Sequence, residues 1–369
     1  MSINGFLRKR IMNSKSIVAA AGALLLVVSF SGISYASGTP AGVILNGVQY
    51  PLEQMPATID KGITWVPLRF VSEKIGAKLN WDPQTQKIEI LKGENRISLT
   101  VGSTTALVNG ESVQLSSPVM QQEGITMVPL RFVSEQLSAE VQWDSILGVV
   151  KIHMPDKDLG EVDPFGRKIR TTNLPKNASD YPYIIEGLPN EMYEMPHRNI
   201  TGSAESAATF SSELNKPLLE RYISMVEQYG NLLLNVDYKV IDQSWVENYM
   251  KLFNQYTNNA TYAKKYVKSV KENHIQVEGT LIPEPSMVFY SDAEVIVRCQ
   301  FAFRIKGSDT DKEIIYDPYF RQTKFQKNIW YVGYTDIGLS SNVFNGTLRN
   351  FKISPTATFF RDYAVHVLK

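Results

Sequence analysis

A segment of 21 residues occurs twice in this chain, 62 positions apart. Residues 62–82 read GITWVPLRFVSEKIGAKLNWD, and residues 124–144 read GITMVPLRFVSEQLSAEVQWD. Fourteen of the 21 positions are identical, and most of the others keep their apolar or polar character. Chance does not produce such a match, so we predict a tandem duplication in the N-terminal third. Because neither copy holds a catalytic set of residue types, the duplication points to architecture or binding rather than to chemistry.

Each copy begins with the signal of a β-hairpin, an Asn-Gly pair between two apolar runs. The pairs are Asn46-Gly47 and Asn109-Gly110. A type I′ turn needs a positive φ at both central residues, and Asn and Gly tolerate that conformation best. A short strand is then expected before Pro67 in the first copy and before Pro129 in the second.

Pro67 and Pro129 stand where a helix is expected to begin, because proline suits the first helical turn. Apolar residues follow at helical spacing in both copies. Gly76 can end the first helix in the left-handed conformation. Ser138 replaces it in the second copy and should adopt that conformation at a higher energetic cost. With a closing hairpin, each copy is predicted to be β-hairpin, short strand, short helix, β-hairpin. One copy offers little core for about 60 residues, so the copies (about 41–93 and 104–155) should pack as one domain, residues 41–155.

This pattern resembles the copper amine oxidase N-terminal-like domain, also called the stalk domain. The residues that carry the resemblance are Asn46-Gly47, Thr64-Trp65-Val66-Pro67-Leu68-Arg69, Ala77 and Trp81-Asp82, and in the second copy Asn109-Gly110, Thr126-Met127-Val128-Pro129-Leu130-Arg131, Ala139 and Trp143-Asp144. The resemblance implies two tandem copies of a non-catalytic α+β module. In that family the oxidase reaction resides in a separate domain with a modified tyrosine and a three-histidine copper site. Here the four histidines are scattered, so we expect no metal and no cofactor.

Two pairs of residues within the repeat have both a structural and a ligand-binding interpretation. Arg69 with Glu73, like Arg131 with Glu135, has the i, i+4 spacing of a helix-surface ion pair, worth about 0.3–0.5 kcal/mol. Trp81 and Trp143 could be platforms for sugars. At strand ends beside a turn, we predict instead that both rings cover the core.

The first 36 residues predict a secretory signal peptide. They contain four cations, no acid, and an apolar run over 17–30, which is short for a membrane span. Cleavage is expected after Ala36, and an uncleaved anchor is the alternative. Removal leaves 34 Lys and Arg against 37 Asp and Glu, so no large basic field remains for nucleic acid. The single cysteine, Cys299, excludes a disulfide within the chain, which fits export from a Gram-positive type of bacterium.

The rest of the chain predicts a linker and a second α+β domain. Residues 156–200 are rich in proline and polar residues and should form a linker or an extended segment. Within residues 201–369, helices are expected over 203–214, from Pro217, after Asp242, and from Asn259 or Thr261. Apolar residues then alternate with partly charged ones over 295–305, and further strands are expected over 313–325 and 328–336. Helices followed by an antiparallel meander indicate helices packed on a curved sheet.

No catalytic motif occurs in this C-terminal region. The alternating pattern places Cys299 on an apolar face, where a buried thiol is inert. Glu284, Asp292 and Glu294 could host glycosidase-like acid and base chemistry, which requires a suitable separation of two carboxylates. Asp309, Asp311 and Glu313 could hold a cation, although acids in a hairpin loop are usually solvated. An aromatic-rich sheet with cations is the predicted ligand-binding surface, formed by Tyr316, Tyr319, Arg321, Trp330 and Tyr334.

These observations favour an exported, non-enzymatic protein of the cell envelope, secreted or associated with the cell wall. The stalk-like domain would be a spacer or wall-contact module, and the C-terminal domain would bind a ligand or partner such as a cell-wall glycan or another envelope protein. No nucleic acid partner and no membrane span are expected after signal cleavage. The alternative is a secreted hydrolase that acts on cell-wall or other polysaccharide through its C-terminal domain.

Overall fold

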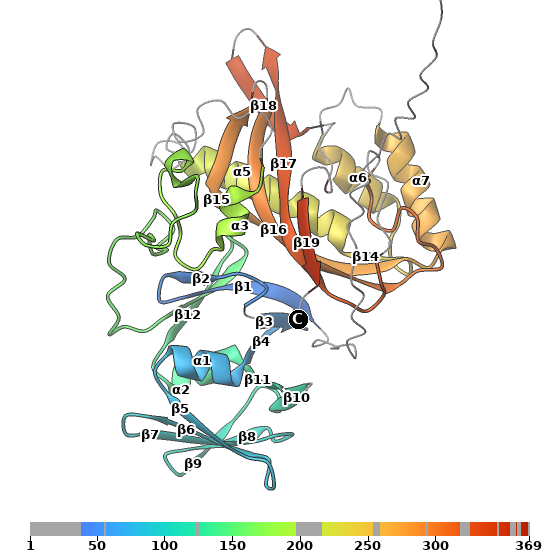
Figure 1. Ribbon diagram of the computed structural model, residues 1–369. Helices are drawn as coiled ribbons and strands as arrows, with labels where there is room; N and C mark the ends of the chain where they lie inside the picture. Colours follow the sequence, from blue (N-terminus) through green and yellow to red (C-terminus); the bar gives the residue numbers. More distant parts are fainter. Residues whose placement is uncertain are drawn as a thin grey trace, which may run out of the picture. The chain divides into compact units, whose positions relative to one another are not determined.

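Figure 1 shows the computed structural model of the chain. The structure describes residues 38–54, 57–122, 125–196, 216–253, 259–291, 294–317, 325–344, 347–354, 359 and 363–367. By its contacts the chain divides into residues 1–32 and 33–369, and the described residues all belong to the second unit. The predicted signal segment and the helix expected over 203–214 lie outside the described residues.

The described residues of the N-terminal region, 38–154, form two short helices and thirteen strands. Both helices begin directly after the predicted prolines. The elements are β1 (Thr39–Leu45), β2 (Val48–Tyr50), β3 (Ala57–Asp60), β4 (Ile63–Pro67), α1 (Leu68–Lys74), β5 (Lys78–Asp82), β6 (Lys87–Lys92), β7 (Asn95–Thr100), β8 (Thr105–Val108), β9 (Glu111–Gln114), β10 (Met120–Gln122), β11 (Ile125–Pro129), α2 (Leu130–Gln136), β12 (Glu140–Asp144) and β13 (Val149–His153).

The predicted turn conformations of this region are confirmed. Both residues of each Asn-Gly pair have positive φ: 49° and 77° at Asn46-Gly47, and 52° and 91° at Asn109-Gly110. Gly76, after α1, has φ of 78°, and Ser138, after α2, has φ of 58°. Ser138 therefore holds the left-handed conformation without glycine's freedom, as the sequence predicted.

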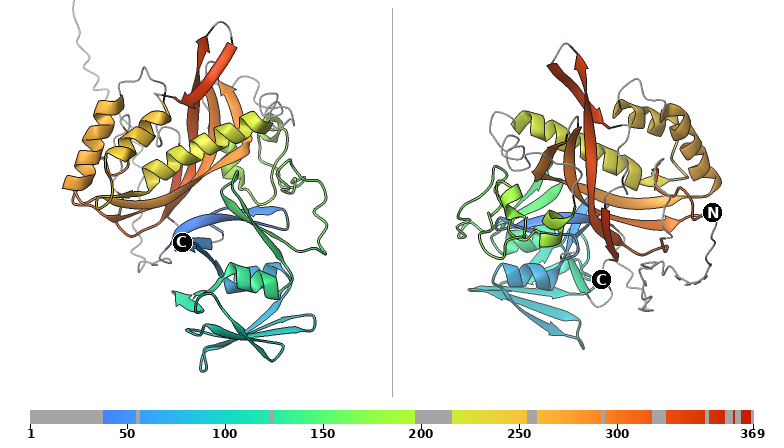
Figure 2. Two further views of the ribbon diagram at one scale, coloured as in Figure 1. Left: turned by 180° about the vertical axis from the view of Figure 1, so that it is seen from behind. Right: turned by 45° about the horizontal axis from the view of Figure 1, so that its top comes forward.

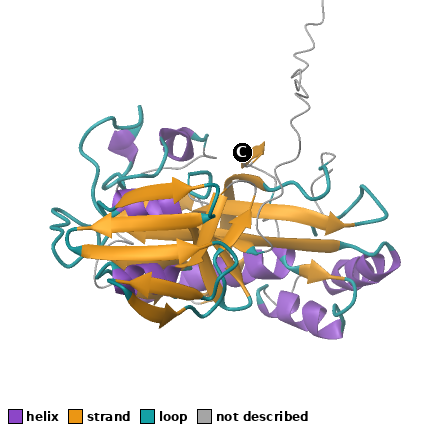
Figure 3. Ribbon diagram, turned by 90° about the horizontal axis from the view of Figure 1, so that it is seen from below, coloured by secondary structure: helices purple, strands orange, loops and turns teal. Residues whose placement is uncertain are grey.

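The two halves of the N-terminal region, residues 39–92 and 95–153, share their sheets. One sheet has the order β5-β6-β7-β8-β9, so the closing hairpin of the first half joins the opening hairpin of the second. The other has the order β10-β11-β4-β3-β1-β13-β12, with β2 paired to β1. Strand β1 runs parallel to β13 and β4 runs antiparallel to β11. Apolar side chains of both halves form one core. In the view from below in Figure 3, strands of this region lie in front and helices lie behind them.

Residues 156–196 form an ordered crossing segment with little regular structure. They contain a 3₁₀ turn, η1 (Ala178–Asp180), and helix α3 (Asn190–Glu194). The amide of Lys168 donates to the carbonyl of Gly47 (2.8 Å), and the amide of Gln49 donates to the carbonyl of Glu186 (3.0 Å). The segment therefore runs along the first hairpin of the N-terminal region.

The C-terminal region confirms an α+β fold, with helices and an antiparallel sheet of order β14-β15-β16-β17-β18 and β19 on β17. Helix α5 crosses this sheet, as the view from behind in Figure 2 shows. Its apolar side chains pack with those of β15 and β16 in one core. The elements are α5 (Lys216–Leu234), β14 (Val236–Asp237), α6 (Gln243–Lys251), α7 (Asn259–Glu272), β15 (Gln276–Ser291), β16 (Glu294–Gly307), β17 (Tyr331–Phe344), β18 (Thr347–Ile353) and β19 (Tyr363–Val367).

The described helix starts agree with the prediction, but the strands differ from it in several respects, and β15 (Gln276–Ser291) was not expected. Asp242 caps α6 by accepting a hydrogen bond from the amide of Ser244. Residues 313–315 form bends, and residues 316, 317 and 325 have no regular structure, so the strand expected over 313–325 is wrong in its described part. Strand β16 was expected to keep one partly charged face, yet eleven consecutive residues, Val295–Ile305, are buried. Helix α5 covers one face, and the crossing segment reaches Arg298 on the other.

Candidate functional site

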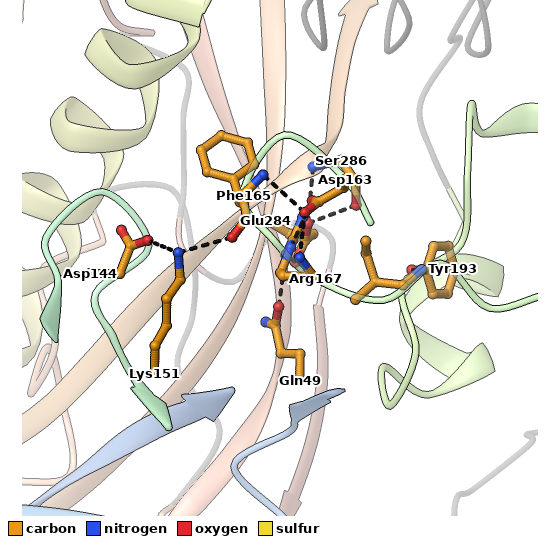
Figure 4. Close-up of polar contacts among 10 residues, drawn as sticks. Gln49, Asp144, Lys151, Asp163, Phe165, Arg167, Tyr193, Glu284 and Ser286 are labelled. Carbon is orange, nitrogen blue, oxygen red and sulfur yellow. Dashed lines mark hydrogen bonds and ion pairs between the residues drawn. The ribbon is translucent and has the colours of Figure 1, made fainter. Parts of the chain in front are cut away.

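A fully buried cluster of charged and polar side chains joins three parts of the chain (Figure 4). Arg167 of the crossing segment is 0% exposed. Its guanidinium contacts Asp163 (Nη2 to Oδ2, 2.7 Å) and donates from Nη1 to Glu284 Oε2 on β15 (2.8 Å). The same Nη1 donates to Gln49 Oε1 on β2 (2.7 Å). We call Gln49, Asp163, Arg167, Glu284 and Ser286 the Arg167 network.

Local backbone features aim the two carboxylates at Arg167. Asp163 Oδ1 accepts from the amides of Phe165 (3.0 Å) and Arg167 (2.8 Å), which folds residues 163–167 into a tight turn. Glu284 lies where the pairing of β15 with β16 shifts between Pro283 and Val288. Such an irregularity redirects a side chain that a regular strand would place differently. Ser286 then donates to Glu284 Oε1 from its amide (2.9 Å) and its hydroxyl (2.7 Å).

Ion pairing keeps the guanidinium of the network charged. Burial lowers the pKa of Arg167, but the adjacent Glu284 and Asp163 carboxylates outweigh burial and raise that pKa above its usual value. Burial also raises the pKa of the nearby Tyr193 hydroxyl, whose oxygen accepts a hydrogen bond from the amide of Ile185 (2.8 Å). A buried ion pair of this kind fixes an arrangement, and removing one partner leaves an uncompensated buried charge.

The Arg167 network is unsuited to acid and base catalysis. Glu284 is 1% exposed, and both of its oxygens accept hydrogen bonds from protein groups. A general acid or base must reach the proton that it transfers in a bound substrate. Of the other two acids considered for glycoside hydrolysis, Glu294 accepts from the hydroxyl of Ser354 and Asp292 lies outside the described residues.

A second buried ion pair attaches the crossing segment to the C-terminal sheet. Arg298 of β16 forms a bidentate pair with Asp336 of β17 (Nε to Oδ1 and Nη2 to Oδ2, both 2.7 Å). Its Nη1 donates to the carbonyls of Met192 (2.8 Å) and Met195 (3.0 Å) at the end of α3. The carbonyls at a helix end are thereby satisfied by a side chain of the sheet.

The described members of the predicted ligand-binding set do not share one surface. Tyr316 is buried against Trp245, Tyr249 and Tyr266, with ring centroids 5.0–5.7 Å apart. Trp330 is buried in the same core beneath Arg304. Tyr334 belongs to a different buried cluster and donates to Glu53 Oε1 (3.2 Å). Tyr319 and Arg321 lie outside the described residues, so ligand binding by the set stays a prediction.

The remaining candidates from the sequence are placed as follows. Cys299 is buried, and burial raises the pKa of its thiol well above the usual value. Asp309 contacts His274 (Oδ2 to Nδ1, 2.6 Å) at the surface. Arg69 and Glu73 form an exposed pair at 4.0 Å. Over the part of the chain that the structure describes, no three His, Cys, Asp or Glu residues are grouped so that they could hold a metal ion.

The two repeated tryptophans have different surroundings. Trp81 is partly buried and packs on the core of the N-terminal region together with Leu79. Trp143 is 49% exposed and its neighbour Val141 is 39% exposed. The prediction that both rings cover the core is therefore wrong for Trp143. Strand β12, which carries it, is the end strand of its sheet, so only β13 flanks it.

Sequence reasoning missed the Arg167 network. Its long-range contacts join residues 117 and 118 positions apart, and Gln49 carries no local signal of burial. The one available signal was the turn sequence from Asp163 to Arg167, which sets opposite charges four positions apart within a proline-rich stretch. The sequence offers Glu284 as a candidate for acid and base chemistry, whereas in the structure its carboxylate is paired with the buried Arg167.

Comparison with known proteins supports the resemblance of the N-terminal region. Residues 44–152 match the family model of the copper amine oxidase N-terminal domain. A stretch of 70 residues is 33% identical to the primary amine oxidase of Klebsiella aerogenes. That stretch is 19% of this chain and 9% of the enzyme, so the similarity spans less than a tenth of that relative.

One feature of the helices bears on membrane contact. Among the described helices, none is both long enough and apolar enough for a membrane crossing.

Proposed function

We propose that this chain is an exported, non-enzymatic protein of the cell envelope of a Gram-positive type of bacterium. The N-terminal region acts as a stalk-like spacer or wall-contact module, and the C-terminal domain binds a ligand or partner. The observation that carries the proposal is the Arg167 network: Glu284, an acid suited by sequence to hydrolysis, is buried and neutralised between the two regions. A group placed in this way holds parts of the chain together and does not meet a substrate.

Export rests on the composition of the first 36 residues, which have the cations, the apolar run and the small residues of a cleaved signal. A duplicated ancestor accounts for the N-terminal region. Each half has an Asn-Gly hairpin, a helix after proline and a closing hairpin, and the halves exchange strands between two sheets. An interlocked pair of units gives a compact spacer with a larger core than either unit alone.

The exposed side of β12 is the proposed wall-contact surface of this module. Val141 and Trp143 stand two positions apart on one strand, so both side chains project from the same face of the sheet. An exposed Trp ring offers a flat apolar surface with one hydrogen-bond donor. Such a surface suits a cell-wall glycan or an extended segment of another envelope protein.

Retention on purified cell wall tests the proposal. The full mature chain should be retained, and Trp143→Ala should lower retention several-fold. Leu107→Ala is the matched control, because Leu107 is an exposed apolar residue (46%) on β8, which belongs to a different sheet from β12. Equal retention of all three proteins would argue against β12, and no retention of any of them would argue against wall contact.

A parallel zymogram on peptidoglycan and other glycans tests the absence of catalysis. We expect no clearing by the full chain. Clearing that disappears on changing Asp292, which lies outside the described residues, would establish the hydrolase alternative instead.

A further inference from the structure

Helix α7 carries a row of lysines on its solvent side. Lys264, Lys265, Lys268 and Lys271 are all exposed, and α7 has one acid, Glu272. The chain as a whole balances 38 Lys and Arg against 37 Asp and Glu. Yet residues 248–271 contain five lysines and no acid, which concentrates positive charge at this one place.

Helix geometry aligns three of these lysines. Lys264, Lys268 and Lys271 follow one another at i, i+4 and i+7, so they lie on one side of the helix. Seven residues of helix rise roughly 10 Å, so the row presents three ammonium groups over about that length. The opposite side of α7 is fixed in the protein core, with Ala263, Tyr266 and Val270 fully or almost fully buried. The lysine side is therefore held outward by packing.

Acidic neighbours neutralise only part of this row. Lys268 lies 3.6 Å from Glu272, and both side chains are more than half exposed, so the pair contributes little. Lys271 acts at longer range on Asp242, whose pKa is lowered mainly by hydrogen bonds from Ser244. For Lys264 and Lys265 the described part of the chain shows no ion pair with an acid.

Helix stability does not explain the whole row. Cations in the last turn of a helix interact favourably with its dipole, and this accounts for Lys271 and in part for Lys268. The effect falls off within one turn, so it does not reach Lys264 and Lys265 in the middle of α7. Tyr262, which is 57% exposed, stands beside Lys265, whose Nζ lies 5.6 Å from the ring centroid.

We infer that the exposed side of α7, formed by the row Lys264, Lys268 and Lys271 with Lys265 flanking it, binds an anionic phosphodiester polymer. Lysine is a flexible point charge that suits phosphate groups along a polymer, where no single geometry is imposed. Several weak contacts on one chain of phosphates add up through their effective concentration. A membrane surface fits less well, because interfacial helices bury an apolar face in the lipid and the apolar side of α7 is already buried in the protein. The inference concerns a different face from β12 and is independent of wall contact by Trp143.

Binding of the full mature chain to poly(glycerol phosphate) tests the inference. Replacing Lys264, Lys265, Lys268 and Lys271 together by Gln should weaken binding by about tenfold or more, and binding by the unaltered chain should fall steeply as salt rises. The matched control replaces Lys61, Lys78, Lys157 and Lys176 by Gln, which removes the same charge from other exposed positions. The control should change affinity by less than about twofold if the site is local.

Further variants separate a loss of binding from a loss of folding. The corresponding four Lys→Arg changes keep the charge and should keep polymer binding. Trp143→Ala should also bind the polymer normally, so failure of the β12 proposal would leave this result intact. Equal weakening by the α7 variant and the control would overturn the inference, as would no binding by the unaltered chain. Tighter binding to phosphatidylglycerol vesicles than to the polymer would replace the polymer by a membrane.

Discussion

The opening hairpins of the two halves have the same turn and different surroundings. Hairpin β1–β2 and hairpin β8–β9 both turn through Asn-Gly with positive φ. Six of the seven residues of β1 are buried, whereas β8 and β9 are largely exposed. A methyl group added at Gly47 would lie 2.8 Å from Lys168 Cγ, whereas one added at Gly110 would meet nothing within 4 Å. The turn is thus set locally, and burial is set by what packs on it.

Contact with the C-terminal domain is the source of this difference. Ile44, Leu52 and Val149 of the N-terminal region belong to the same apolar core as α5 and the long strands. Gln49 of β2 reaches the Arg167 network. Strand β1 and its neighbour β13 therefore contribute side chains to two cores, whereas the second hairpin contributes to one. The repeated tryptophans differ in the same sense, since Trp81 of the first half is partly buried against the core and Trp143 of the second half is exposed.

The largest expected effect comes from breaking the contact that distinguishes the two hairpins. Arg167→Met removes the cation and leaves Asp163 and Glu284 buried without a partner charge, which should lower the free energy of unfolding by about 3–5 kcal/mol. Arg96→Met, next to the exposed second hairpin, should change it by less than about 0.5 kcal/mol. Urea unfolding of the full chain measures both. A loss below about 1 kcal/mol for Arg167→Met would mean that the network does not hold the regions together.

A second comparison uses the two tryptophans. Trp81→Ala removes a ring that packs on the core and should cost about 2–3 kcal/mol, less than a fully buried ring would. Trp143→Ala removes a half-exposed ring and should cost less than about 1 kcal/mol. The same unfolding experiment applies to both variants. Equal losses would contradict the difference in burial between the two strands.

A third comparison concerns the residues that end α1 and α2. Ser138→Gly relieves the left-handed conformation of a residue with a Cβ and should stabilise the protein by about 0.5–1 kcal/mol. Gly76→Ser introduces the same strain and should destabilise by a similar amount, since nothing lies within 4 Å of the added atom. Thermal unfolding of both variants gives the signs. Two changes in stability of the same sign would show that packing, rather than backbone conformation, determines the effect of substitution at these positions.

The smallest expected effect depends on pH and involves Glu53, which follows β2. Burial is the largest cause that raises the pKa of Glu53, and Glu191 raises it further, while hydrogen bonds from its own amide and from Tyr334 and the charge of His366 lower it. A carboxyl whose pKa is higher in the folded state binds protons more readily there, so its contribution to stability increases as pH falls through the folded pKa toward the unfolded value.

Glu53→Gln should remove this contribution to the pH dependence and should stabilise the protein slightly at neutral pH. The unfolding free energy of both proteins, measured as a function of pH, gives the difference curve. Glu111→Gln, on exposed strand β9, is the control. We expect the unaltered protein to gain stability relative to Glu53→Gln as pH falls. A loss of stability relative to Glu53→Gln over the same pH range would contradict the assigned cause.

The sequence predicted those features whose causes are local. Asn-Gly turns, the helix starts after proline and the Asp242 cap each depend on a few neighbouring residues. Strand β15 was missed because Gly279, Pro283 and Pro285 argue against a strand, and the structure accommodates the prolines in a shift of pairing. The buried face of β16 was misjudged because Arg298 finds its partners 38 or more positions away. Exposure of Trp143 also depends on the order of strands in the sheet, which the repeat alone does not encode.

Hydrogen exchange of the full chain in the native state tests most directly whether the first half of the N-terminal region is held by the C-terminal domain. Amides of β1 should exchange with a free energy close to that of β16, because both strands contribute to one core. Amides of β8 and β9 should exchange at a lower free energy. If β1 exchanged together with β8 and β9, well before β16, the two regions would open independently and the account of a joined spacer and binding domain would be contradicted.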